Sequence, residues 1–210
     1  DCGVERVLAI STDKAVNPIN LYGATKLCAE KLFVQGNSYS GEGGTKLSCV
    51  RYGNALASRG SVIPLFLEQN RSNGVITVTD KRMTRFWITL DKGVEFVLGC
   101  LEKMHGGEIF IPKSPSMNIM DLVSAIAPDC EVKVTGVRTG EKIHELLISS
   151  DEASKTLEFP DMFVIQPAHV WWSEGNWGGG QTIPDGFEYV SNDNPQTMTI
   201  DELKEIVANL

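Results

Sequence analysis

The sequence has none of the features that mark a membrane-spanning or secreted protein. Its 210 residues contain no run of 18 or more apolar residues, so no transmembrane helix is expected. A secretory signal peptide is not expected either, because the chain passes from Asp-Cys-Gly, without an initiator Met, directly into a strand pattern. The 19 Lys and Arg residues are outnumbered by 27 Asp and Glu. The resulting net charge of −8 argues against nucleic acid and anionic membranes as partners.

The sequence also lacks the patterns of a metal site or a disulfide framework. The five cysteines are odd in number and include no Cys-x-x-Cys pair, and the three histidines are scattered, so no metal is expected. We interpret the cysteines as buried free thiols in a reducing compartment, which predicts a cytoplasmic location. The acidic charge still permits a phosphate-bearing ligand, because a few arginines in a cleft can bind a diphosphate.

Apolar periodicity predicts strands that alternate with helices. Strands are expected at 7–10, 47–52, 75–78, 86–89 and 108–111. Helices are expected at 21–35, 62–69 and 91–104, and the alternation continues through 121–127, 131–135 and 141–148. This order predicts an α/β fold with a doubly wound parallel sheet. Residues 151–195 are expected to form an irregular region, and a short helix is expected at 200–208.

Burial can be predicted for the first two elements. The strand at 7–10 is wholly apolar, so it is expected to be buried on both faces of a parallel sheet. On the first helix, four apolar residues recur at helical spacing and are expected to face the core: Leu21, Ala24, Cys28 and Leu32. The Gly/Ser-rich segment 36–46 is expected to be a loop.

The residues with the clearest chemistry stand between the first strand and the first helix. Ser11 and Thr12 end the strand, where open α/β sheets bind ligands. Tyr22 and Lys26 are four apart on the helix, so their Cβ atoms lie about 5–6 Å apart. A Lys ammonium next to a phenol favours the phenolate, a base able to take a hydroxyl proton. Tyr-x-x-x-Lys is common on amphipathic helices, and it becomes informative here because a strand-end hydroxyl precedes it.

The whole string from Ser11 to Lys26, STDKAVNPINLYGATK, resembles the UDP-N-acetylglucosamine 4,6-dehydratases (5-inverting) of flagellin modification and pseudaminic acid synthesis. These enzymes belong to the extended branch of the short-chain dehydrogenase/reductase superfamily. The resemblance covers nearly the whole chain. It continues through Val50–Asn54, Ser58–Pro64, Asp80–Trp87 and Gly136–Glu145, and faintly at Asn192–Pro195.

The resemblance implies a reaction and a role for each residue of this string. Such enzymes oxidise carbon 4 of the hexose with a nicotinamide cofactor, eliminate water across carbons 5 and 6, and return the hydride to carbon 6. Thr12, Tyr22 and Lys26 would serve the oxidation. Tyr22 and Lys26 would also bind the cofactor, which would be NADP or, alternatively, NAD. Asp13 would be the acid and Lys14 the base of the elimination.

Four further residues are candidates for binding the sugar nucleotide. Asn54 follows a predicted strand and matches a family position near the diphosphate. Arg85 and Arg138 carry guanidinium groups, which match phosphate oxygens in a bidentate manner. Glu141 is a candidate acceptor for ribose hydroxyls. The tryptophans 171, 172 and 177 with the glycines 178–180 are assigned no chemistry and are interpreted as a flexible loop against a neighbouring subunit of a homo-oligomer.

One motif of the superfamily is missing. The Gly-x-Gly-x-x-Gly turn that binds the cofactor pyrophosphate does not occur in the sequence. We therefore expect about a hundred upstream residues to be absent. Residues 1–60 are then the end of the dinucleotide-binding domain, and 61–210 are mainly the sugar-nucleotide-binding region. The chain alone is expected to be inactive, to bind the cofactor poorly and to expose a sheet edge.

Three other interpretations remain open. A UDP-sugar 4-epimerase would need Thr12, Tyr22 and Lys26 but no acid/base pair, so Asp13 and Lys14 argue against it. A retaining dehydratase would carry a Met where this chain has Tyr22, so the tyrosine favours the inverting branch. A non-catalytic UDP-sugar-binding module is disfavoured by the complete catalytic set.

Overall fold

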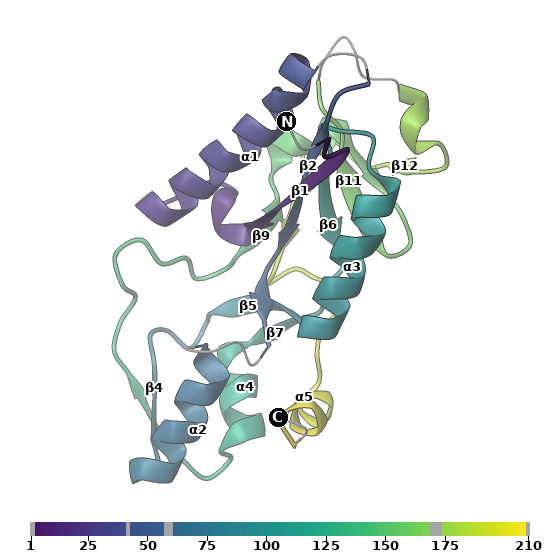
Figure 1. Ribbon diagram of the computed structural model, residues 1–210. Helices are drawn as coiled ribbons and strands as arrows, with labels where there is room; N and C mark the ends of the chain where they lie inside the picture. The colour runs from purple at the N-terminus through teal and green to yellow at the C-terminus, as the bar shows by residue number, and fades with distance from the viewer. Residues whose placement is uncertain (1–2, 41–42, 57–60, 169–173, 209–210) are drawn as a thin grey trace. The chain divides into compact units, whose positions relative to one another are not determined.

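The computed structural model describes residues 3–40, 43–56, 61–168 and 174–208. The chain folds into two compact units, each made of three segments (Figure 1). Unit 1 consists of Asp1–Tyr52, Val94–Lys113 and Leu146–Tyr189. Unit 2 consists of Gly53–Gly93, Ser114–Glu145 and Val190–Leu210.

Unit 1 is built on a six-stranded sheet in the order β1-β2-β6-β11-β10-β12. The strands β1 (Arg6–Thr12), β2 (Lys46–Tyr52) and β6 (Ile109–Pro112) are parallel. The antiparallel remainder comprises β11 (Met162–Ile165), β10 (Thr156–Glu158) and β12 (Gln181–Thr182). The predicted α/β class is confirmed, and the sheet is parallel in its first half and antiparallel in its second.

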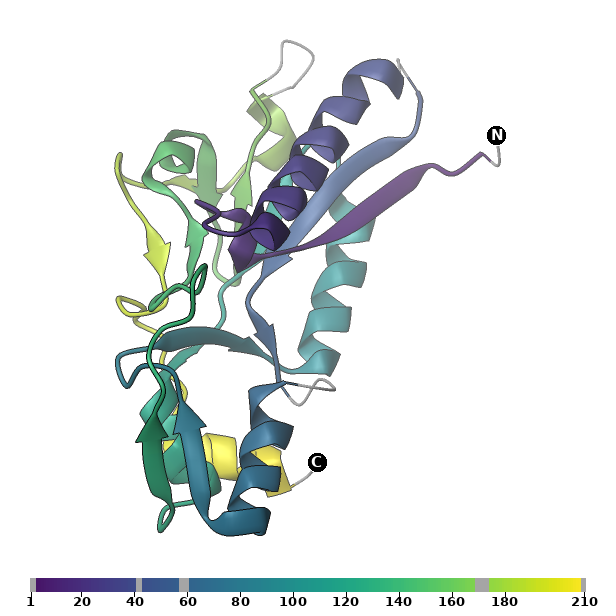
Figure 2. The same ribbon diagram turned by 90° about the vertical axis from the view of Figure 1, so that its left-hand side faces the viewer.

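Two helices lie on opposite faces of the parallel strands, as Figures 1 and 2 show. The helix α1 (Leu21–Ser40) packs on β1 and β2. On the other face, the unit 1 part of α3 (Leu90–Lys103) contributes Cys100 to a core with Val50 and Phe110. This arrangement is the doubly wound layering that the alternation of elements predicted.

The predicted core face of α1 is wrong. Leu21 and Leu32 are 80% and 72% exposed, whereas Gly23 and Glu30 are buried. Polar partners on β2 determine which face of α1 is buried. Glu30 binds Arg51 of β2, and the side chain of Asn37 donates to the carbonyl of Leu47 at 2.7 Å and accepts from its N–H at 2.9 Å. Hydrogen bonding of buried groups has here outweighed the apolar pattern.

Other boundaries and burial states also differ from the prediction. Ile10 is 43% exposed because β1 is the edge strand of this sheet. The segment predicted as a loop from 36 is helical up to Ser40. Residues 141–148 form no helix and end in β9 (Leu146–Ile148), and the irregular region contains buried sheet strands, β11 among them. This region also contains two short helices, η2 (Ser150–Lys155) and η3 (Glu174–Trp177), and the strand β13 (Tyr189–Val190).

A buried ionic network crosses unit 1. Arg51 is 0% exposed, and its guanidinium donates to both carboxylate oxygens of Glu30, at 3.0 and 2.7 Å, and to both of Glu152, at 3.0 Å each. It also donates to the carbonyl of Leu147 at 2.8 Å. Ser11 Oγ donates to Glu30 as well. Burial alone would lower the pKa of Arg51, but the hydrogen bonds and charges of the two carboxylates raise it.

A second buried carboxylate anchors Trp177. Glu108 is 0% exposed and accepts hydrogen bonds from Ser48 Oγ at 2.6 Å and from Trp177 Nε1 at 3.1 Å. The indole also makes edge contacts with the rings of Phe110 and Phe159. Trp177 is therefore anchored to the core of unit 1, while tryptophans 171 and 172 lie outside the described residues, and the packing of this segment on a neighbouring subunit stays a prediction.

Unit 2 has a core between short strands and three helices. Its strands are β3 (Asn54–Ala55), β4 (Val75–Val78), β5 (Thr84–Ile88), β7 (Ser116–Asn118) and β8 (Glu131–Val134). Its helices are α2 (Val62–Asn73), α4 (Ile119–Ile126) and α5 (Ile200–Ala208), which is the short helix predicted at 200–208. Phe66, Trp87 and Leu122 lie in this core. Gly74 ends α2 in the left-handed conformation at φ 66°, which glycine adopts without strain.

The cysteines differ in accessibility. Cys49 and Cys100 are buried as expected, and burial raises the pKa of each thiol to about 12. Cys28 is exposed, which contradicts the expectation for that residue, and Cys2 lies outside the described residues. Within the described ranges, no helix is long and apolar enough to span a membrane, and no group of His, Cys, Asp and Glu could hold a metal ion.

Because thiolates rather than thiols react, iodoacetamide is expected to alkylate Cys28 rapidly and Cys49 and Cys100 only after unfolding. Mass spectrometry of the native and the urea-unfolded protein would measure this difference. Cys28→Ser is the control and should remove the fast modification at that site. Rapid native modification of Cys100 would contradict the burial of this thiol.

Candidate active site

The end of β1 leads directly into a short 3-10 helix, η1 (Asp13–Ala15). Thr12 is its N-cap, and the hydroxyl of Thr12 donates to Asp13 Oδ1 at 2.8 Å. Lys14 Nζ donates to the same oxygen at 2.9 Å. Asp13 is 0% exposed, whereas the side chain of Lys14 is 35% exposed. The strand end thus presents a buried carboxylate in direct contact with a partly accessible amine.

The second oxygen of Asp13 has no hydrogen-bond partner among the described residues. Asp13 Oδ2 is buried and accepts no hydrogen bond from any described residue. A buried acceptor without a donor is unfavourable by about 1–3 kcal/mol, so native proteins leave few of them. Such an atom next to a reactive amine is typical of a site that is completed by a ligand.

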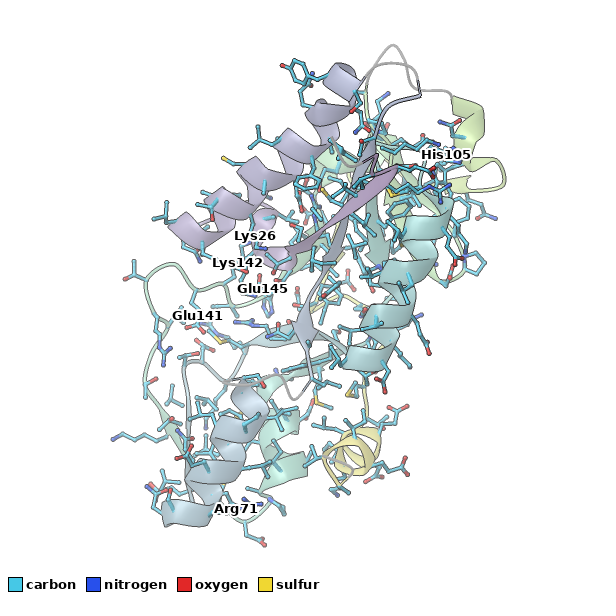
Figure 3. The ribbon with its side chains drawn as sticks, viewed as in Figure 1. Lys26, Arg71, His105, Glu141, Lys142 and Glu145 are labelled. Carbon is cyan, nitrogen blue, oxygen red and sulfur yellow. The ribbon has the colours of Figure 1, made fainter. Side chains whose placement is uncertain are left out.

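The first turn of α1 carries the other predicted catalytic pair. Asn20 caps this turn, because its side-chain oxygen accepts the N–H of Gly23 at 2.8 Å. Tyr22 is 54% exposed, and its hydroxyl makes no hydrogen bond within the described part of the chain. Lys26 (Figure 3) donates from Nζ to the carbonyl of Ile10 at 3.1 Å. Lys26 is therefore tied to β1 close to Thr12, and the phenol of Tyr22 is accessible to a ligand.

All five predicted catalytic residues belong to unit 1 and come from one continuous stretch of the chain. Hydrogen bonds link Thr12 and Lys14 to Asp13, and α1 packs against η1. The four predicted substrate residues all belong to unit 2.

Asn54 lies in β3, opposite Trp87 of β5. Its side-chain oxygen Oδ1 is buried and has no hydrogen-bond partner among the described residues. Like Asp13 Oδ2, this acceptor is available to a donor from a ligand.

The guanidinium of Arg85 contacts mainly residues of its own unit. Its guanidinium donates to the carbonyls of Thr84, Ile143 and Lys142 at 2.7, 3.0 and 2.9 Å. Its nitrogens also lie 3.9 Å from a carboxylate oxygen of Glu141 and 3.8 Å from one of Glu145. The segment that surrounds it can be followed in Figure 3, where Glu141, Lys142 and Glu145 are labelled. Arg85 therefore holds this segment in place, and any phosphate contact would share its donors.

Arg138 and Glu141 meet in a turn. The backbone N–H of Arg138 donates to Glu141 Oε2 at 3.4 Å, and the N–H of Glu141 donates to the carbonyl of Arg138 at 3.1 Å. The side chain of Arg138 is exposed and that of Glu141 is partly exposed. Both are accessible to a ligand, unlike the mostly buried Arg85.

The sequence analysis missed a polar network beside Arg85. Thr84 Oγ1 lies 2.9 Å from His144 Nδ1 and 2.6 Å from Ser191 Oγ, and Ser191 Oγ accepts the N–H of Glu145 at 2.9 Å. Burial, followed by the charges of Arg85 and Arg82, lowers the pKa of His144. His144 and Glu145 lie in the motif Gly136–Glu145 and could have been noticed there, whereas no local signal marks Ser191.

Residues 1–167 match the family model described as "Polysaccharide biosynthesis protein". A UDP-N-acetylglucosamine 4,6-dehydratase (inverting) from Campylobacter jejuni is 49% identical over 98% of this chain. A UDP-glucose 4-epimerase from Rickettsia conorii is 37% identical over 99% of the chain. The chain spans 64% and 62% of the lengths of these two relatives.

Among solved structures, Pen from Bacillus thuringiensis superposes with a TM-score of 0.85 at 33% identity. The alignment covers 99% of this chain and 63% of that one. The resemblance to inverting UDP-N-acetylglucosamine dehydratases that the motifs indicated is thus confirmed, and so is the fold class.

Proposed function

The chain belongs to the polysaccharide biosynthesis protein family, and from this premise we propose that the whole protein is a nucleotide-sugar 4,6-dehydratase. Its substrate is UDP-N-acetylglucosamine, and its product is a UDP 4-keto-6-deoxy-L-arabino-hexosulose, with inversion at carbon 5. The observation that carries the proposal is the buried Asp13 carboxylate, which binds Lys14 through one oxygen and has no partner for the other in the described part of the chain. The dehydratase relative at 49% identity supports the same substrate.

The oxidation is assigned to Thr12, Tyr22 and Lys26. Tyr22 is the proposed base that takes the proton of the carbon 4 hydroxyl, and Lys26 lies one turn further along the same helix. Thr12 provides a hydroxyl at the strand end to orient the sugar. The accessible, unbonded phenol of Tyr22 and the nearby Lys26 fit the ribose of a nicotinamide cofactor, NADP or NAD. When bound there, such a cofactor would supply hydride transfer, from carbon 4 in the oxidation and to carbon 6 in the reduction.

The elimination is assigned to Asp13 and Lys14. A keto group at carbon 4 acidifies the carbon 5 proton, so that a neutral amine can remove it while an acid protonates the departing carbon 6 hydroxyl. Transfer of one proton along the 2.9 Å contact from Lys14 Nζ to Asp13 Oδ1 produces both species at once. The burial of Asp13 keeps its carboxyl group out of contact with solvent.

Unit 2 supplies the proposed contacts to the nucleotide. Asn54 offers its buried unpartnered oxygen, and Arg138 offers an exposed guanidinium to the diphosphate. Glu141 is the proposed acceptor for ribose hydroxyls, and Arg85 is proposed to bind phosphate from the segment that it holds. In the whole protein we assign residues 1–60 to the dinucleotide-binding domain and 61–210 mainly to sugar-nucleotide binding, within a cytoplasmic homo-oligomer.

The test is NMR of UDP-N-acetylglucosamine incubated with the whole protein and a nicotinamide cofactor in deuterated water. The expected product is a 6-deoxy-4-keto sugar with deuterium at carbon 5 and inverted configuration. Formation of the 4-epimer alone would establish the epimerase alternative, and binding without turnover would establish a non-catalytic module. The 210-residue chain by itself is expected to bind the UDP-sugar without turnover.

A further inference from the structure

We propose that Gly23 is a positioning residue that sets the distance between the oxidation pair and the elimination pair. The inference rests on the proposed function for the roles of these pairs. Gly23 has no functional group and takes no part in the proposed chemical steps, so this role is separate from them.

Gly23 lies where α1 packs closely against η1. A Cβ atom built on Gly23 would lie 2.2 Å from the backbone carbonyl oxygen of Lys14 and 3.2 Å from its carbonyl carbon. It would also lie 3.0 Å from Pro18 Cβ. Because the nearest of these atoms belongs to the backbone, no side-chain rotation could relieve the contact. Any residue other than glycine requires α1 or η1 to move.

This contact lies between the two catalytic pairs. Gly23 directly follows Tyr22 and is three residues before Lys26, while the carbonyl that it touches belongs to Lys14 itself. The N–H of Gly23 donates to Asn20 Oδ1 at 2.8 Å, which ties the first turn of α1 to the segment that precedes it. With no Cβ at position 23, the turn that carries Tyr22 can lie close to the backbone of Lys14, and this close approach helps to set the separation of Tyr22 from Asp13 and Lys14.

The reaction requires that separation to match one hexose. Tyr22 acts at carbon 4, whereas Lys14 and Asp13 act at carbons 5 and 6 of the same ring, so both pairs must reach their atoms from a single bound position. An Ala side chain at position 23 would have to move about 1 Å away from the Lys14 carbonyl to reach ordinary contact. Misplacement of a catalytic group by about 1 Å can lower a rate by about 10²-fold.

The experiment compares Gly23→Ala with Gly99→Ala in the whole protein. Gly99 lies within α3, and a Cβ there would meet nothing within 4 Å, so its variant controls for the Gly-to-Ala change in a helix. For Gly23→Ala we expect kcat for dehydration to fall about 100-fold, with KM within about threefold of the wild type. In single turnovers, oxidation at carbon 4, followed as cofactor reduction, should slow far less than product formation. Gly99→Ala should behave as the wild type.

Three results would overturn the proposal. One is a kcat for Gly23→Ala equal to that of the wild type. Another is a loss of activity that only reflects a smaller folded fraction, so that active-site titration restores the wild-type kcat. The third is a crystal structure of the variant in which the first turn of α1 has not moved relative to η1. That structure also decides the inference if the wild type shows no dehydratase activity, an outcome that would reject the proposed function alone.

Discussion

Replacing Arg51 with Met is expected to lower the free energy of unfolding by about 3–5 kcal/mol. The substitution removes the only described cationic partner of Glu30, whose side chain is 1% exposed, and leaves its carboxylate buried with Ser11 as a remaining donor. It also frees the carbonyl of Leu147, which accepts from Arg51 at 2.8 Å. Urea denaturation of the whole protein, followed by circular dichroism, would measure the change.

Two further variants separate the buried charge from the lost packing. Arg82→Met is the matched control, because Arg82 makes the same two-nitrogen contact with Asp80 but is 70% exposed. An exposed pair of this kind contributes little, so its loss should hardly change stability. The double variant Arg51→Met with Glu30→Met should recover part of the loss, because it leaves no unpaired charge in the core. Equal losses for Arg51→Met and Arg82→Met would contradict the argument.

The same network predicts a dependence of stability on pH. Burial alone would raise the pKa of Glu152, but hydrogen bonds from Arg51 and Ser149 lower it below its ordinary value of 4.5. A carboxylate with a lowered pKa in the folded state stabilises the protein above its unfolded pKa. This contribution is lost as the pH falls below 4.5 and through the folded pKa. In the variant Glu152→Gln, the decline of stability below pH 4.5 should be shallower than in the wild type.

The network also explains what the sequence could not reveal about the fold. Apolar spacing on α1 pointed to Leu21 and Leu32, but the buried positions were decided by Arg51, which is 21 residues from Glu30 along the chain. A hydrophobic pattern contains no information about which charge finds a buried partner on another element. The regular alternation of apolar strands and helices needs no such partner, and it was predicted correctly through 62–134 except for the short strand β7.

The candidate site likewise contains residues that the sequence indicated and residues that only the structure shows. Thr12, Asp13, Lys14, Tyr22 and Lys26 fall within fifteen residues on one strand-to-helix connection, so the local sequence was sufficient to propose them as one site. The network around Thr84 joins residues 60 and 107 positions apart, and only the folded chain shows it. Gly23 has no functional group, and its importance depends on a carbonyl that no residue pattern indicates.

Substitution of either member of the elimination pair is expected to stop dehydration while leaving oxidation in place. Asp13→Asn keeps the size of the side chain but removes the acid, and Lys14→Met removes the base. General acid–base groups contribute about 10²–10⁴-fold each, so product formation should slow by that factor, which corresponds to roughly 3–5 kcal/mol in the barrier. Tyr22→Phe should instead abolish oxidation and dehydration together, because it removes the base for the carbon 4 hydroxyl.

Solvent deuterium distinguishes the two members of the pair. With Lys14→Met, carbon 5 should acquire no deuterium, because nothing removes its proton. With Asp13→Asn, Lys14 can lose its proton only to solvent, so recovered substrate should acquire deuterium at carbon 5 slowly even though water is not expelled. Lys31→Met, an exposed lysine on α1, is the control for loss of a positive charge and should turn over as the wild type. If Lys14→Met incorporated deuterium at the wild-type rate, the base would have to be another residue, and the assignment of Lys14 would be wrong.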